Sequence, residues 1–209
     1  MPQAIERTGL AVRFGDLAAT GLGMLLGVLA LQDVSAACAP ASTPATRQSV
    51  TQPDAAEMHE SQALYLPTPH AVVGAMLRLA RVSQADVVYD LGAGDGRIPI
   101  AAARDHGARG VGIELDGRMI ERARCNAREA GVERLVEFRQ EDLFRTDLRG
   151  ATVVTLFLFP EMNRRLWPKL LAELRPGTRI VSHRFGLGDW APERTVEAGG
   201  HPVLLWTVP

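Results

Sequence analysis

The chain has 209 residues, with 23 basic and 24 acidic side chains and a formal net charge of −1 at pH 7. This balance gives no overall attraction to nucleic acid or to an anionic membrane surface, and the length allows one domain of common size plus a tail. The two cysteines, Cys38 and Cys125, lie far apart and no residues have the spacing of metal ligands, so we expect neither a disulfide nor a metal site.

Residues 1–37 have the pattern of a targeting segment. Residues 17–32 carry no charge, two arginines precede them, and the small residues Ser35-Ala36-Ala37 follow. This order is typical of a secretory signal. The sixteen uncharged residues fall slightly short of the roughly 17–25 that a spanning helix needs, so an uncleaved membrane anchor is the alternative. We therefore predict an exported or membrane-associated protein, while a domain on the cytoplasmic face stays open.

A change in composition separates this segment from the rest of the chain. Residues 38–60 are rich in Pro, Ser, Thr, Ala and Gln and have no apolar period, which predicts a disordered linker. The folded domain is expected to occupy residues 61–209. We predict Thr68 as the N-cap of its first helix and Pro69 as the first helical residue.

Beyond that helix, apolar β-branched runs alternate with helical patterns, which predicts a parallel sheet covered on both faces. The predicted strands are residues 86–91, 110–114, 135–139, 152–158 and 179–183, and the predicted helices are 97–105, 116–130 and one within 163–174. The second helix should begin at Asp116 and stop at Gly131, and Pro168 should delay the start of the third. Two further strands joined by Gly199-Gly200 predict an antiparallel hairpin. The fold class is α/β, a Rossmann-like, mostly parallel sheet of seven strands with this hairpin at its end.

The stretch Asp90-Leu91-Gly92-Ala93-Gly94-Asp95-Gly96-Arg97 directly follows the first predicted strand. A strand, a glycine turn and a helix N-terminus together cradle nucleotide-like ligands. Gly92 and Gly94 would let the backbone approach such a ligand closely. The spacing differs from a dinucleotide fingerprint because Arg97 stands where the third glycine is expected.

The charges beside the turn indicate which ligand fits. Asp90 and Asp95 suit a cationic or hydroxyl-rich ligand better than a pyrophosphate. S-adenosylmethionine is such a ligand, because it carries an ammonium, a sulfonium and a ribose. We therefore predict S-adenosylmethionine as cofactor, held in part by Asp90, Gly92, Gly94, Asp95 and Gly96.

Two more acids stand where a nucleoside needs them. Glu114 ends the second strand, about twenty residues past the glycine turn, where a carboxylate can accept hydrogen bonds from both ribose hydroxyls. Asp142 follows the third strand and could accept from the exocyclic amine of adenine, a role for which Glu141 competes. Each acid alone is more often a solvated loop residue, but both lie at carboxyl ends of strands, where ligands bind.

These residues carry a resemblance to a known class. The stretch from Asp90 to Gly96, together with Glu114 and Asp142, resembles the first three motifs of class I S-adenosylmethionine-dependent methyltransferases. A narrower resemblance rests on Tyr65-Leu66-Pro67-Thr68-Pro69 and Ser182-His183-Arg184-Phe185. These segments are similar to bacterial relatives of the mitochondrial lysine methyltransferases that act on the ATP synthase c-ring protein and the adenine nucleotide translocase.

The resemblance implies a function and two further site residues. It implies that Tyr65 and Thr68 fold over the cofactor and that the substrate is a lysine on a protein, which could be membrane-associated. Arg184 departs from the Ser-His-Asp-Phe pattern of similar bacterial proteins.

The catalytic residues are left open. The Asn-Pro-Pro-Tyr signature of other amino-group methyltransferases is absent after the fourth strand. Phe157 and Phe159 could line an apolar channel, Glu161 or Asn163 could orient the amine, and His183 could act as a base. All of these side chains could equally be structural.

Three functions fit the sequence. A domain without an inserted substrate-binding region leaves its site open, which favours a protein-lysine N-methyltransferase. The alternatives are a methyltransferase of a small or lipid-like molecule near the membrane, and a non-catalytic, exported nucleoside-binding domain. The last is motivated by the export signal, because S-adenosylmethionine is made in the cytoplasm. The sequence does not indicate an oligomeric state.

Overall fold

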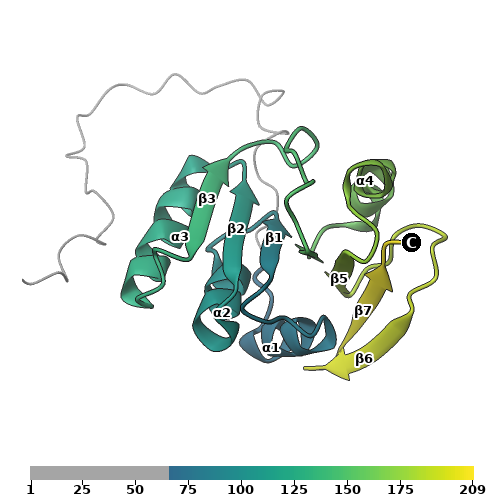
Figure 1. Ribbon diagram of the computed structural model, residues 1–209, viewed down its shortest axis with the longest axis horizontal. Coiled ribbons are helices and arrows are strands. Elements are labelled where there is room, and N and C mark those ends of the chain that lie inside the picture. Colours follow the sequence, from purple (N-terminus) through teal and green to yellow (C-terminus); the bar gives the residue numbers. More distant parts are fainter. Residues whose placement is uncertain (1–65) are drawn as a thin grey trace, which may run out of the picture. The chain divides into compact units, whose positions relative to one another are not determined.

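The computed structural model describes residues 66–209, which form a seven-stranded sheet in the order β3-β2-β1-β4-β5-β7-β6 (Figure 1). The strands are β1 (Val87–Leu91), β2 (Arg109–Glu114), β3 (Val136–Gln140), β4 (Val153–Leu156), β5 (Arg179–His183), β6 (Arg194–Ala198) and β7 (His201–Thr207). The helices are α1 (His70–Leu79), α2 (Arg97–His106), α3 (Gly117–Glu129) and α4 (Pro160–Glu173). Strands β1 to β5 pair in parallel, whereas β7 runs antiparallel to β5 and β6. The predicted fold is confirmed.

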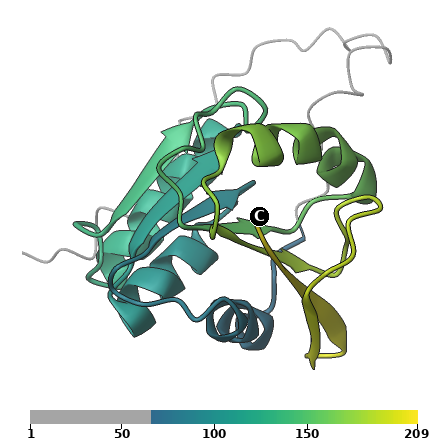
Figure 2. The same cartoon turned by 45° about the vertical axis from the view of Figure 1, so that its right-hand side comes forward.

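Helices cover both faces of the sheet. The ribbon views show α1, α2 and α3 on one face and α4 on the other (Figures 1 and 2). Neighbouring strand residues point to opposite layers: Val88 and Val153 pack in the core that includes α1 and α2, whereas Tyr89 and Val154 pack in the core that includes α4. Because both faces are buried, the strands are apolar at successive positions rather than at alternate ones.

Two predicted helix starts are wrong. Helix α1 has Pro69 at its N-cap without a side-chain hydrogen bond, because the hydroxyl of Thr68 lies against His183 instead. Helix α4 begins at Pro160 and continues through Pro168. A proline in the first turn loses no helical hydrogen bond. Leu166 and Leu170, on either side of Pro168, are buried against the sheet, and this burial outweighs the one hydrogen bond that Pro168 removes.

The other local predictions agree with the structure more closely. The side chain of Asp116 accepts a hydrogen bond from Arg118 N at the start of α3, as expected of an N-cap. Gly131 follows this helix with a φ of 68°. The fourth strand ends at Leu156 instead of residue 158, so Phe157 belongs to the connection that leads to α4.

Several predictions fall on residues outside the described part. These are the targeting segment 1–37, the linker 38–60 and the site residue Tyr65. Within residues 66–209, no helix is both long enough and apolar enough to cross a membrane. The prediction that no disulfide forms is wrong for Cys125, which is disulfide-bonded, because separation along a sequence does not report distance in the folded chain.

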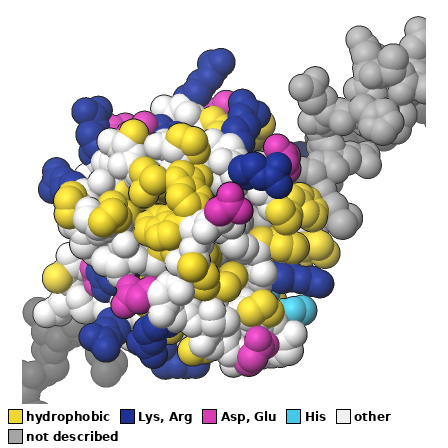
Figure 3. Space-filling view, turned by 90° about the vertical axis from the view of Figure 1, so that its right-hand side faces the viewer, with side chains coloured by type: hydrophobic (Ala, Val, Ile, Leu, Met, Phe, Trp, Pro, Cys, Tyr) yellow, Lys and Arg dark blue, Asp and Glu magenta, His cyan; other side chains and the backbone are white. Residues whose placement is uncertain are grey.

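An aromatic cluster joins α4 to the antiparallel end of the sheet. The ring centroids of Trp167 and Trp190 lie 5.2 Å apart, and those of Trp190 and Trp206 lie 6.3 Å apart. The indole of Trp206 also donates a hydrogen bond to Trp190 O at 2.8 Å. Figure 3 shows apolar side chains gathered on this side of the molecule. These contacts hold the loop after β5 against α4, and this loop borders the candidate site.

Candidate active site

The glycine turn lies between β1 and α2, at the edge of the sheet where the parallel strands end. Gly92, Gly94 and Gly96 have φ angles of 84°, 53° and 78°, which residues with a side chain rarely adopt. Gly92 N and Ala93 N each donate to Ile113 O at 2.9 Å, so the turn is fixed against β2. Ligands of open α/β sheets bind at this edge.

Backbone groups hold the carboxylate of Glu114 next to the turn. Its Oε2 accepts from Gly94 N at 2.9 Å, and its Oε1 accepts from Leu115 N at 2.7 Å and Asp116 N at 3.0 Å. Leu115 was not predicted as a site residue, although its side chain is 69% exposed directly beside this acid. An exposed apolar side chain at this position could cover a flat ring such as adenine.

Asp90 is a buried acid beneath the turn. It is 3% exposed and accepts a hydrogen bond from Thr155 Oγ1 at 2.7 Å. Burial raises the pKa of Asp90 to about 7, and the nearby carboxylates of Glu114 and Asp95 act in the same direction. Three acids close together favour a cation, so the residues present fit the ammonium and sulfonium of S-adenosylmethionine.

Asp95 ties the start of the domain to the glycine turn. Its carboxylate accepts two hydrogen bonds from the guanidinium of Arg97, of 2.9 and 2.6 Å, and one from Arg97 N at 3.3 Å. Arg97 Nη1 donates to Thr68 O at 2.9 Å. The Thr68 hydroxyl lies 3.3 Å from His183 Nδ1, at the end of β5. Thr68 therefore lies at the predicted site, and Asp95 acts there through Arg97 in addition to any contact with a ligand.

The two acids after β3 differ in their surroundings. Asp142 accepts a hydrogen bond from Phe144 N at 2.9 Å, and its side chain is 41% exposed. Glu141 instead accepts from Thr146 Oγ1 at 2.8 Å. Because Glu141 N donates to Glu114 O at 3.1 Å, this segment lies beside the end of β2. Both acids therefore follow β3 in a segment beside Glu114, as the predicted adenosine site requires.

Three phenylalanine rings gather beyond β4 and β5. The rings of Phe157 and Phe185 are nearly parallel, with centroids 6.4 Å apart, and the centroids of Phe159 and Phe185 are 6.3 Å apart. Phe159 is 50% exposed. Phe185 was not predicted as a site residue, although it ends the Ser182-His183-Arg184-Phe185 segment on which the resemblance partly rests. These rings provide an apolar surface next to the acidic cofactor region.

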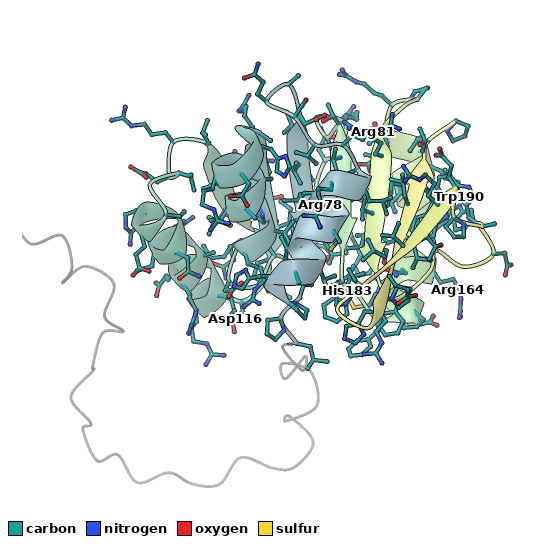
Figure 4. All side chains as sticks on the ribbon, turned by 90° about the horizontal axis from the view of Figure 1, so that it is seen from below. Arg78, Arg81, Asp116, Arg164, His183 and Trp190 are labelled. Atoms are coloured by element: carbon teal, nitrogen blue, oxygen red, sulfur yellow. The ribbon has the colours of Figure 1, made fainter. Side chains whose placement is uncertain are left out.

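The remaining polar candidates separate into one exposed and two buried side chains. Glu161 is 80% exposed and pairs with Arg164 at 2.8 Å on the outside of α4. Its carboxylate therefore does not lie with the other candidate catalytic side chains. Asn163 and His183 are 0% and 1% exposed. Figure 4 shows His183 and Arg164 on the edge of the domain where Asp116 follows β2.

His183 does not have the properties of a general base. Burial lowers the pKa of its imidazole to about 4, and the neighbouring His201 and Arg184 act in the same direction. An imidazole with this pKa is neutral at pH 7 and takes up protons poorly. Its ring lies 4.0 Å from that of Phe157. The structure therefore favours a hydrogen-bonding role for His183 over proton uptake.

The sheet order, the glycine turn after β1 and the acids after β2 and β3 define a class I S-adenosylmethionine-dependent methyltransferase. S-adenosylmethionine is its cofactor. Residues 90–194 match the family model of the ANTKMT methyltransferase domain, and the chain belongs to this family. This confirms the resemblance found in the motifs, and the chain is an enzyme rather than a non-catalytic binding domain.

Individual relatives match much of the domain. A protein-lysine N-methyltransferase of Saccharolobus islandicus is 45% identical over 149 residues, 69% of this chain and 92% of the relative. An adenine nucleotide translocase lysine N-methyltransferase of Mus musculus is 38% identical over 121 residues, 58% of this chain and 53% of the relative, so the chain spans about half of that protein. A further match is the crystal structure of an RNA methyltransferase from Salinibacter ruber bound to S-adenosyl-L-homocysteine. Its sequence is 59% identical, and the match has a TM-score of 0.68 and covers 69% of this chain and 94% of that chain.

Proposed function

We propose that the enzyme is a protein-lysine N-methyltransferase and that its substrate is a lysine on another protein, one associated with a membrane. The observation that carries this proposal is the apolar surface of Phe157, Phe159 and Phe185 next to the cofactor region. The four-carbon stem of a lysine packs well against such rings. The 45% identity to a protein-lysine N-methyltransferase supports the same substrate class.

The chemistry depends on bringing a neutral amine to the cofactor. S-adenosylmethionine would supply a methyl group on a sulfonium. The lone pair of an amine can attack this methyl carbon in line and displace the neutral thioether. The phenylalanine rings would exclude water from the amine, and this lowers the pKa of a lysine so that its neutral form is available. The segment around Thr68 and the rings around Phe157 would hold the amine in position, and positioning supplies much of the acceleration in such reactions.

RNA is the second candidate substrate. The 59% identical structure from Salinibacter ruber is described as an RNA methyltransferase, and phenylalanine rings can also stack on bases. The net charge of −1 speaks against RNA, because affinity for a polyanion depends strongly on lysine and arginine contacts to phosphates. We therefore place the lysine substrate first.

A direct comparison of substrates tests the proposal. The full chain is incubated with methyl-labelled S-adenosylmethionine and with a membrane-protein fraction, a lipid extract or total RNA from the same cells, and mass spectrometry locates the label. We expect methyl groups on protein lysines and none with the Glu114→Ala control. The background should be low because the chain has one lysine, Lys169, whose side chain is 15% exposed and bonded to Glu173. Label confined to RNA or to lipid would contradict the proposal.

We also propose that residues 17–32 bring the enzyme to a membrane or through it. The proposal is supported by the uncharged character of this segment and by the basic residues before it. The full chain is expected in the membrane or exported fraction of cells, and a chain without residues 1–37 in the soluble cell fraction. Fractionation followed by immunoblotting checks this, and the same distribution for both chains would argue against any targeting role.

A further inference from the structure

Two buried polar atoms in the described domain lack a hydrogen-bond partner. Within residues 66–209, these are Asn163 Oδ1 and His183 Nε2. Buried polar atoms nearly always have partners, because an unmade hydrogen bond costs stability. Both side chains lie at the end of the sheet that carries the candidate site, so a missing substrate group would explain both atoms.

The surroundings of Asn163 determine which way its amide points. Its Nδ2 lies 3.1 Å from Gly186 O and 3.4 Å from Phe185 O. Both neighbours are carbonyl oxygens, which accept but do not donate, so the amide nitrogen must face them. The oxygen of Asn163 therefore points away from this loop, as an acceptor without a donor.

His183 can offer a second acceptor. A neutral imidazole carries one N–H and one lone pair, and the lowered pKa of His183 keeps the ring neutral at pH 7. Its Nδ1 lies 3.3 Å from the hydroxyl of Thr68. When Nδ1 donates its proton to this hydroxyl, the lone pair of the imidazole is on Nε2, the atom that has no partner.

His183 borders the phenylalanine rings, and Asn163 borders the backbone of the loop that carries one of them. The imidazole of His183 lies 4.0 Å from the ring of Phe157, which in turn stacks on Phe185. Asn163 reaches the same loop through its bonds to Phe185 O and Gly186 O. A lysine stem that packs against these rings would carry its amine toward the two unpartnered atoms.

We propose that Asn163 Oδ1 and His183 Nε2 accept the two N–H groups of the neutral target amine. This inference rests on the proposed lysine substrate. A neutral primary amine has two N–H groups and one lone pair, so two acceptors leave the lone pair directed at the methyl group. The lone pair forms the new N–C bond, the C–S bond breaks with its electrons going to sulfur, and the resulting ammonium releases a proton to solvent.

The proposal predicts a dependence on how many methyl groups the lysine already carries. Lysine has two N–H groups in its neutral form, monomethyl-lysine has one, and dimethyl-lysine has none. Asn163→Leu and His183→Phe should therefore lower the rate most on unmodified lysine, by up to about tenfold for a lost neutral hydrogen bond. The loss should be smaller on monomethyl-lysine, where either acceptor suffices, and absent on dimethyl-lysine.

The experiment measures kcat and KM on three peptides that differ only in the methylation of one lysine. Ser182→Ala is the matched control, because it removes the 2.6 Å hydrogen bond to Phe185 O in the same loop and keeps both acceptors. Calorimetric titration with S-adenosylmethionine checks that each variant is folded. Leucine and phenylalanine preserve the approximate size of the side chains they replace.

Three outcomes are distinguishable. The inference is supported if both variants lose less rate on dimethyl-lysine than on lysine. Ser182→Ala should then change the rate equally on all three peptides. An equal loss on all three peptides in Asn163→Leu and His183→Phe overturns it and assigns these residues to loop packing. A wild-type enzyme that methylates RNA or lipid but no peptide overturns the proposed function itself.

Discussion

Asp90→Asn is expected to make the cofactor-free enzyme more stable and its complex with S-adenosylmethionine weaker. Asparagine keeps an oxygen that can accept from Thr155 Oγ1 but carries no charge in the buried position. Loss of the carboxylate removes a charge-assisted interaction worth on the order of 1.5–3 kcal/mol, so affinity should fall about tenfold to a hundredfold. Calorimetric titration measures this loss.

The effect of Asp90→Asn on stability should depend on pH. The pKa of Asp90 is raised from 3.8 to about 7 in the folded chain. Below pH 3.8 the group is protonated in the folded and unfolded states, so it has no effect on stability there. As pH rises toward 7, the unfolded state loses its proton first, and folding becomes less favourable by about 1.4 kcal/mol for each pKa unit. At pH 8 the variant should be more stable by up to roughly 4 kcal/mol.

Urea denaturation of both proteins at pH 4 and pH 8 checks the sign, with Asp105→Asn as the control. Asp105 is an exposed acid on α2 whose pKa is lowered by a hydrogen bond from Arg104, so its replacement should not stabilise the protein at pH 8. If Asp90→Asn gives the same difference in unfolding free energy at both pH values, the stability of the folded enzyme does not depend on this ionisation.

The affinity of the wild type for S-adenosylmethionine should also rise as pH increases through 7, because the charged form of Asp90 favours a cationic ligand.

The sheet and the cofactor region were predictable because their signals are local. A strand buried on both faces is an apolar run, as in residues 87–91, and the turn after it requires glycines that are close in sequence. Glu114 and Asp142 could be assigned because each directly follows a strand, and parallel strands bring their ends to one edge. The cap of α3 at Asp116 was readable for the same reason, since a cap and its partner lie within one turn.

The polar connections of the site were not predictable because they join distant residues. Thr68 was interpreted as a helix cap, but its hydroxyl lies against His183, 115 positions along the chain. The link from Asp95 through Arg97 to Thr68 O depends on where the first segment crosses the glycine turn. The start of α4 was wrong because helix propensity penalises Pro168, whereas burial of Leu166 and Leu170 is a property of the assembled layers.

Gly96→Ala is expected to destabilise the domain and to weaken cofactor binding. Gly96 has a φ of 78°, and a Cβ at this position would lie 2.6 Å from Phe138 and 2.9 Å from Ala123. The left-handed backbone costs a residue with a side chain about 1–2 kcal/mol, and overpacking adds about 1–3 kcal/mol. Gly131→Ala is the matched control, because its φ is 68° but nothing lies within 4 Å of the added Cβ. Denaturant unfolding should show a larger loss of unfolding free energy for Gly96→Ala than for the control. The difference between the two losses measures the clash of the added Cβ with α3 and β3. Equal losses would mean that the turn moves to accommodate a methyl group, and the rigidity assigned to this cofactor loop would then be wrong.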